Sequence, residues 1–266
     1  MEFLLKGFLV MVFLWGFFRV LCEVYYWRYL GRKVELSKYG RGSWALVAEA
    51  KEGISLSFAR ALAAHNFNIV LVGKDFQKLK AFQEELVKFH SVGVKVFHKD
   101  FQECFYSPSE FFSELEKDLV PLDISIVVSN FEESFDKLFS ETTTQEATTQ
   151  NALSLWPVVY LTKALCSRMT QRDFSSAVIS VNSGLSLKPG RCFYLAGKSF
   201  EDLFTLIAKE EVNKRSKHKV DFLSLRLGYV DSNANHSQEC VEPALAALGR
   251  VPYCCGSWKH ILDCLK

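Results

Sequence analysis

One stretch limits the possible folds more than any other, WALVAEAKEGISLSFARALAAHNFNIVLVGKD, which runs from Trp44 to Asp75. It contains an apolar run, a short turn, an amphipathic helical pattern and a second apolar run. Two short apolar runs joined by a helix predict parallel strands with a crossover connection. The stretch therefore predicts the first strand-helix-strand unit of a doubly wound sheet.

The same alternation continues along the rest of the chain. We expect strands over 44–48, 68–72, 94–97, 124–129, 177–181 and 220–225, and helices over 56–65, 77–90, 108–119, 145–169 and 193–215. Such alternation is typical of a parallel sheet with helices on both faces. The sequence predicts a Rossmann-like α/β domain over 43–266, preceded by a hinge over 31–42.

The first 30 residues have a different character. GFLVMVFLWGFF, residues 7–18, is an unbroken apolar run bordered by Lys6 and Arg19. A membrane span needs roughly 20 apolar residues, so the stems of these two side chains would lie along the apolar core. We expect residues 1–30 to form a membrane-anchor helix. A cleaved signal peptide is the alternative, but the bulky aromatic residues of YYWRY follow the run where a signal peptide has small ones.

Charge and metal-ligand spacing restrict the partners. Arg19, Arg28, Arg32 and Lys33 outweigh Lys6 across the apolar run, which places the domain on the cytoplasmic side of a membrane or on the matrix side in a mitochondrion. The formal net charge of +2 comes without a long basic run, so no nucleic-acid surface is predicted. The eight cysteines and six histidines lack metal-ligand spacing, and no metal site is predicted.

The order of these elements from about Lys38 to His260 resembles the short-chain dehydrogenase/reductase family. SKYGRGSWALV, FNIVLVGKDFQKLK and GSWKHIL resemble its branch of membrane-bound 17β-hydroxysteroid dehydrogenases and very-long-chain 3-ketoacyl-CoA reductases. The resemblance implies a keto substrate, NADP(H) as the cofactor and the endoplasmic reticulum as the membrane. A subunit of an energy-converting complex would instead lie in the mitochondrial inner membrane.

Four side chains match the types that carry the reduction in this family. YLAGK supplies Tyr194 and Lys198, one helical turn apart on the same face. An adjacent ammonium favours the phenolate, so Tyr194 would protonate the carbonyl oxygen while Lys198 also holds the nicotinamide ribose. Ser183 would polarise the carbonyl, and Asn151 would hold a water in the proton relay. Ser183 precedes Tyr194 by eleven residues, which is shorter than the usual spacing in the family.

The cofactor turn departs from the family pattern. Thr-Gly-x-x-x-Gly-x-Gly falls on Ala48, Glu49, Gly53 and Ser55, so only Gly53 matches. Glycines allow conformations closed to other residues and a close approach of the phosphates to the helix amino terminus. Glu49 adds a negative charge where the pyrophosphate should lie, and two unit charges about 4 Å apart repel by roughly 4 kcal/mol at an effective dielectric near 20.

Other cofactor positions partly match. SNFE at the end of the fourth strand keeps Asn130 but has Glu132 where the family has a glycine. Lys74 stands where a basic residue meets the 2′-phosphate of NADP, and Asp100 stands where the acid meets adenine. A surface lysine and a turn-capping aspartate are the structural alternatives.

The sequence supports two principal functions. One is an anchored NADP(H)-dependent reductase of 3-ketoacyl-CoA or steroid ketones. The other is a non-enzymatic descendant that serves as an accessory or scaffold subunit of a membrane protein complex, and a protein that holds nucleotide without turnover lies between them. The departures fall in the phosphate-binding turns while the strands and helices remain intact, which favours the non-enzymatic function.

Overall fold

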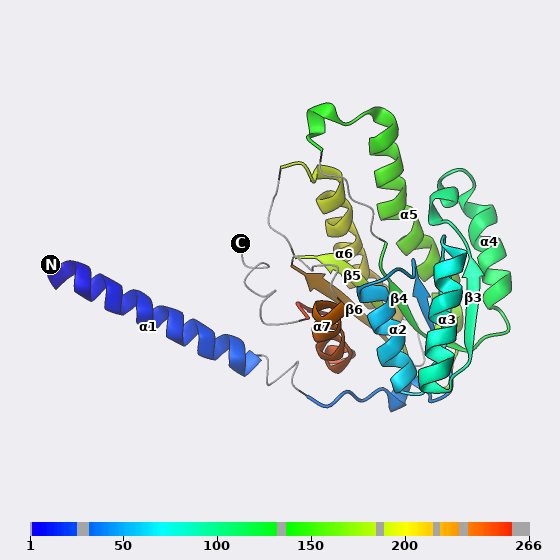
Figure 1. Cartoon of the computed structure of the whole chain (residues 1–266), viewed down its shortest axis with the longest axis horizontal. Coiled ribbons are helices and arrows are strands. Elements are labelled where there is room, and N and C mark those ends of the chain that lie inside the picture. The colour runs from blue at the N-terminus through cyan, green and yellow to red at the C-terminus, as the bar shows by residue number, and fades with distance from the viewer. Residues whose placement is uncertain are drawn as a thin grey trace.

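The computed structural model contains one parallel sheet with helices on both faces (Figure 1). It describes residues 2–25, 32–131, 137–184, 189–214, 219–228 and 234–256. The strand order is β3-β2-β1-β4-β5-β6-β7, and each neighbouring pair is parallel. The strands are β1 (Trp44–Ala48), β2 (Asn68–Gly73), β3 (Val94–His98), β4 (Ile124–Ser129), β5 (Ser176–Ser183), β6 (Val220–Leu227) and β7 (Tyr253–Cys254).

Helices bury an apolar core on each face of the sheet. They are α2 (Ile54–Ala64), α3 (Phe76–His90), α4 (Pro108–Leu119), α5 (Thr144–Met169), α6 (Cys192–Asn213) and α7 (Ala234–Ala247), with short 3₁₀ helices η2 (Ser37–Tyr39), η3 (Phe101–Phe105) and η4 (Phe139–Glu141). One core lies beneath α2, α3 and α7, and the other lies beneath α4, α5 and α6. The predicted doubly wound sheet is confirmed.

The six predicted strands and five predicted helices between them are present, with ends that differ by a few residues. The sequence did not predict α7, β7 or the three short 3₁₀ helices. The sequence of α7 begins with the polar ANHSQEC and contains Pro243, and neither feature is typical of a helix interior. β7 has two residues, which is too short to give an apolar run.

The segment over 31–42, predicted as a hinge, packs against the domain where the structure describes it. Tyr39 is fully buried, and its hydroxyl donates to the Asp221 carboxylate of β6 at 2.8 Å. The Lys38 ammonium lies 2.6 Å from the same carboxylate. Asp221 is itself buried. Lys38 balances the charge of its carboxylate and Tyr39 hydrogen-bonds it, and without them the charge would be unpaired in the protein interior.

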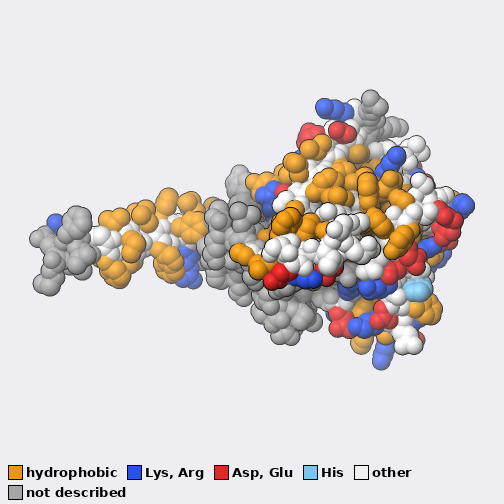
Figure 2. All heavy atoms as spheres, turned by 90° about the horizontal axis from the view of Figure 1, so that it is seen from above, with side chains coloured by type: hydrophobic (Ala, Val, Ile, Leu, Met, Phe, Trp, Pro, Cys, Tyr) orange, Lys and Arg blue, Asp and Glu red, His pale blue; other side chains and the backbone are white. Residues whose placement is uncertain are grey.

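α1 (Glu2–Tyr25) is the helix expected over residues 1–30, and Figure 1 shows it extending away from the sheet. Its large apolar side chains are exposed, with Phe13 at 72%. Figure 2 shows hydrophobic side chains along this helix and across one face of the domain. Among the residues described, no helix is both long enough and apolar enough to pass through a lipid bilayer.

Candidate functional site

The chain reverses its direction across the sheet between β1 and β4. From β1 it continues to β2 and β3 on one side, and β4 then returns to pair with β1 on the other. Ligands of doubly wound sheets bind beyond the carboxyl ends of the strands at this point. The turn after β1, Asn130 after β4 and Ser183 at the end of β5 all lie at that edge. This edge is the candidate functional site.

The turn after β1 keeps the backbone shape of a glycine turn without its first glycine. Glu49 has a φ of 53°, a left-handed conformation that glycine adopts without strain. Gly53 has a φ of 88° and precedes the first residue of α2. The Glu49 side chain is nearly buried and forms an ion pair with Lys51 at 2.9 Å. The negative charge predicted at this turn is therefore held in place by a neighbouring lysine.

Two of the predicted cofactor residues are hydrogen-bonded to each other. The amide of Asn130 donates to the Ser55 hydroxyl at 3.1 Å, and that hydroxyl donates to the backbone carbonyl of Glu49 at 3.1 Å. Ser55 is fully buried and Asn130 is 7% exposed. The Ser55 side chain thus occupies the position of the third glycine and links the turn after β1 to the end of β4.

Two phenylalanines, Phe101 next to Asp100 and Phe131 next to Asn130, pack against each other at this edge. The rings of Phe101 and Phe131 pack edge to face with their centroids 4.8 Å apart, and both side chains are buried. The cavity that they line with Glu49, Lys74 and Asp100 has a volume of about 10 Å³. That volume holds about one water molecule.

Asp100 and Lys74 lie near each other at the edge of the candidate site. A carboxylate oxygen of Asp100 accepts a hydrogen bond from the backbone N–H of Gln102 at 2.9 Å and so caps the 3₁₀ helix η3. Lys74 is exposed at the end of β2. Both residues line the small cavity described above, and their predicted contacts with NADP stay predictions.

Lys198 is turned into the protein. Its ammonium donates to the backbone carbonyls of Phe131 at 2.6 Å and Val181 at 3.0 Å, and to the Glu201 carboxylate at 3.3 Å. Lys198 is 3% exposed and Glu201 is fully buried. Since an ammonium has three N–H donors, these three acceptors use all of them. The carboxylate also balances the buried positive charge.

The other predicted catalytic residues lie at different depths. Tyr194 is half-buried in the first turn of α6, and Ser183 is half-buried at the last residue of β5. Glu132 lies outside the described residues.

Asn151 and Ser154 both lie on α5, and their exposure differs. Asn151 is exposed, whereas Ser154 is 7% exposed and lies against Gly197 of α6. A side chain at Gly197 would collide with Ser154, so these two small residues mark the close approach of the two helices. Gly197 in YLAGK was the available signal, because a glycine inside a helix indicates a close neighbour.

Comparisons with known proteins agree with this fold. Residues 43–241 match the family described as short chain dehydrogenase. The very-long-chain 3-oxoacyl-CoA reductase of Schizosaccharomyces pombe is 28% identical over 202 residues, covering 71% of this chain and 58% of that protein. The 17-beta-hydroxysteroid dehydrogenase type 3 of Homo sapiens is 25% identical over 190 residues, covering 70% and 58%. The matched part thus spans less than two thirds of either relative.

Solved structures show the same architecture. The tetragonal crystal structure of the bulky-bulky ketone specific alcohol dehydrogenase from Comamonas testosteroni has a TM-score of 0.66 and 19% identity, covering 76% of this chain and 80% of that one. The L-sorbose reductase from Gluconobacter frateurii, complexed with NADPH and L-sorbose, has a TM-score of 0.64 and 20% identity, covering 71% and 70%. At these identities the likeness establishes the fold.

Proposed function

The chain belongs to the short-chain dehydrogenase family. We propose that it is a member in which the residues of the reductase site bind other groups of the same chain and do not hold a cofactor. In this proposal the protein is an accessory or scaffold subunit of a membrane protein complex. The observation that carries the proposal is the bonding of Lys198, whose three donors all bind acceptors of the same chain. A lysine in this state has no free donor for a nicotinamide ribose.

The pairing of Lys198 also bears on proton transfer. In the reductase mechanism, the ammonium charge stabilises a phenolate at the neighbouring tyrosine. Here that charge is balanced by the buried Glu201 at 3.3 Å. In this proposal the ammonium of Lys198 stabilises Glu201 in place of a phenolate at Tyr194.

The turn after β1 and the two phenylalanines support the same proposal. Ser55 and Asn130 hydrogen-bond each other, and the rings of Phe101 and Phe131 pack edge to face. The Ser55 side chain stands where the family pattern has a glycine, at the close approach of the phosphates to the helix amino terminus. In this arrangement the residues do not fit NADP(H).

Two exposed apolar surfaces support attachment to other molecules. α1 exposes apolar side chains around its whole circumference, and we propose that it attaches the protein to a membrane, either the endoplasmic reticulum by resemblance or the mitochondrial inner membrane. The second surface lies on α5 and α6 and includes Trp156, Phe200, Leu203 and Ile207. Exposed apolar side chains gathered on one surface favour a protein partner.

The proposal is tested by assaying the purified full chain with NADPH and either a 3-oxoacyl-CoA or a steroid ketone. We expect no consumption of NADPH above that of the Tyr194→Phe variant. Turnover that Tyr194→Phe abolishes would overturn the proposal.

For the scaffold role, affinity purification from detergent-solubilised membranes should recover partners in a fixed stoichiometry, and a Leu203→Glu/Ile207→Glu variant should lose them. Recovery of the chain alone from its native membrane would count against that role.

The second candidate function is an active NADP(H)-dependent reductase. It is favoured by the partial exposure of Tyr194 one turn before Lys198, and by the reductase and dehydrogenase activities for which the relatives are named. This function requires Lys198 to leave Glu201 when the cofactor binds. In that case Glu201→Gln, which releases the ammonium from its carboxylate, should raise the rate of NADPH oxidation, whereas a chain without a working site should show no activity in either form.

A further inference from the structure

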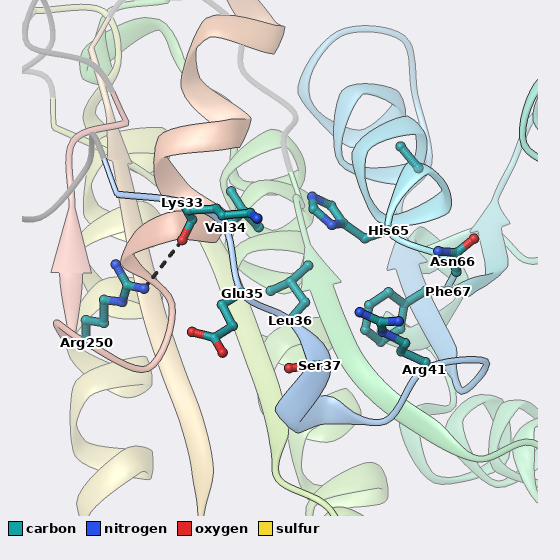
Figure 3. A pocket seen from close by; sticks show the side chains of 11 residues that line it. Lys33, Val34, Glu35, Leu36, Ser37, Arg41, His65, Asn66, Phe67 and Arg250 are labelled. Carbon is teal, nitrogen blue, oxygen red and sulfur yellow. Dashed lines mark hydrogen bonds between the residues drawn. The ribbon is translucent and has the colours of Figure 1, made fainter.

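A second pocket lies at the other end of the sheet, where the strands begin. It has a volume of about 580 Å³ and is bounded by the segment over 33–41, by the connection from α2 to β2, and by Arg250 after α7 (Figure 3). Pockets of this size accommodate small molecules. The pocket is separate from the candidate functional site, because that site lies beyond the carboxyl ends of the strands.

The lining of this pocket is strongly cationic. Lys33, Arg41 and Arg250 are positively charged, and Glu35 is the one carboxylate among the described lining residues. Figure 3 shows Lys33 and Arg41 on the same side of the 33–37 segment as His65, whereas Glu35 and Arg250 lie on the other side. Neither Lys33 nor Arg41 forms an ion pair with an acidic side chain in the described part of the chain.

The end of α2 does not account for these cations. Cations are favourable near the last carbonyls of a helix, which carry partial negative charge. Here backbone N–H groups already serve those carbonyls: His65 donates to Ala61 at 3.2 Å, Asn66 to Ala63 at 2.9 Å and Phe67 to Leu62 at 3.1 Å. Neither Lys33 nor Arg41 donates a hydrogen bond to them. The two cations therefore remain available to an external anion.

We propose that this pocket binds a phosphate-bearing ligand. The guanidinium of Arg41 and the ammonium of Lys33 are the groups that recognise phosphate oxygens, and Ser37 adds a hydroxyl to the lining. The buried Phe67 and Leu36 give the pocket an apolar floor. Two sources share this chemistry, the headgroup of an anionic phospholipid and a soluble phosphate compound.

The position of the pocket along the chain fits either source. Lys33 follows Tyr25, the last residue of α1, by eight positions, so the pocket is close in sequence to the helix that we propose attaches the protein to a membrane. A soluble phosphate compound would reach the pocket from solvent, since Lys33 and Arg41 are both exposed. The inference does not depend on whether the reductase site is active.

The experiment compares the full chain with two double variants that lose the same charge. Lys33→Gln/Arg41→Gln removes two cations from the pocket, and Lys117→Gln/Lys163→Gln removes two exposed cations elsewhere. Binding of inorganic phosphate to each detergent-purified protein is measured by calorimetry. Binding to phosphatidylcholine vesicles with and without phosphatidic acid is measured by flotation. Thermal unfolding of each variant verifies that it is folded.

We expect the unmodified chain and the control variant to bind phosphate or to gain affinity from phosphatidic acid, and the pocket variant to lose at least about tenfold of that affinity. A loss in the calorimetric arm identifies a soluble phosphate group as sufficient, and a loss in the vesicle arm alone identifies a lipid headgroup. Equal losses in both double variants would overturn the proposal, because only general surface charge would then be acting. Absence of binding in both arms would overturn it as well.

Discussion

Lys198 and Glu201 lie three residues apart on α6, and their side chains have almost no exposed surface. A buried ion pair contributes little net stability compared with an apolar pair, but breaking it leaves an uncompensated charge. We expect Glu201→Ala to lower the free energy of unfolding by about 3–5 kcal/mol, as judged by urea denaturation. The double variant Lys198→Met/Glu201→Leu should recover most of this loss. A small effect of Glu201→Ala would show that Lys198 reaches solvent and is not committed to the interior.

Glu49 has a left-handed backbone conformation, which favours glycine over glutamate. A left-handed conformation costs a non-glycine residue roughly 1–2 kcal/mol. Glu49→Gly should therefore raise the free energy of unfolding by about 1 kcal/mol, after the loss of the partly exposed ion pair with Lys51. Glu52, exposed in the same turn and not left-handed, is the matched control, and Glu52→Gly should not stabilise. Equal effects of the two glycines on the unfolding midpoint would contradict a left-handed Glu49.

At the scale of the element, α5 begins with a capping box that responds to pH. Glu146 accepts hydrogen bonds from Lys137 at 2.9 Å and from the backbone N–H of Thr143 at 2.8 Å. The bond from Lys137, followed by those from Thr143, lowers the pKa of Glu146 to about 2. An unfolded glutamate has a pKa of about 4.3. The stabilisation is therefore fully present above that value and is lost as the pH falls toward 2.

Thermal unfolding as a function of pH should reveal this capping contribution. Between about pH 5 and pH 2, the unmodified chain should lose more stability than Glu146→Gln, because glutamine does not titrate. At neutral pH the variant should be the less stable of the two. Parallel pH profiles for the two proteins would contradict the role of Glu146.

The segment before β1 makes a separate prediction. Tyr39→Phe removes one of the two donors to the buried Asp221 carboxylate. We expect a loss of about 1–3 kcal/mol in the free energy of unfolding, together with faster proteolytic cleavage within 32–42. Tyr106→Phe is the matched control, because Tyr106 is 78% exposed. Unchanged proteolysis in Tyr39→Phe would mean that packing alone holds the segment.

At the scale of the whole molecule, the sequence predicts the sheet well because its strands are continuous apolar runs with helical patterns between them. The site was harder to predict, because its contacts join residues that are far apart in the chain. Lys198 binds carbonyls at the ends of β4 and β5, and sequence spacing gives no information on those contacts. The close approach of α5 and α6 at Ser154 and Gly197 was not predicted either, because it depends on how the two helices pack.

The central claim is that the dehydrogenase residues are bound to one another and do not hold a cofactor. Titration of NADPH into the purified full chain, followed by nucleotide fluorescence, tests it most directly. We expect no saturable binding up to millimolar NADPH. This result would mean that the binding free energy of NADPH is weaker than about 4 kcal/mol. Saturable binding at micromolar NADPH, with a loss of affinity in Lys198→Met, would contradict it.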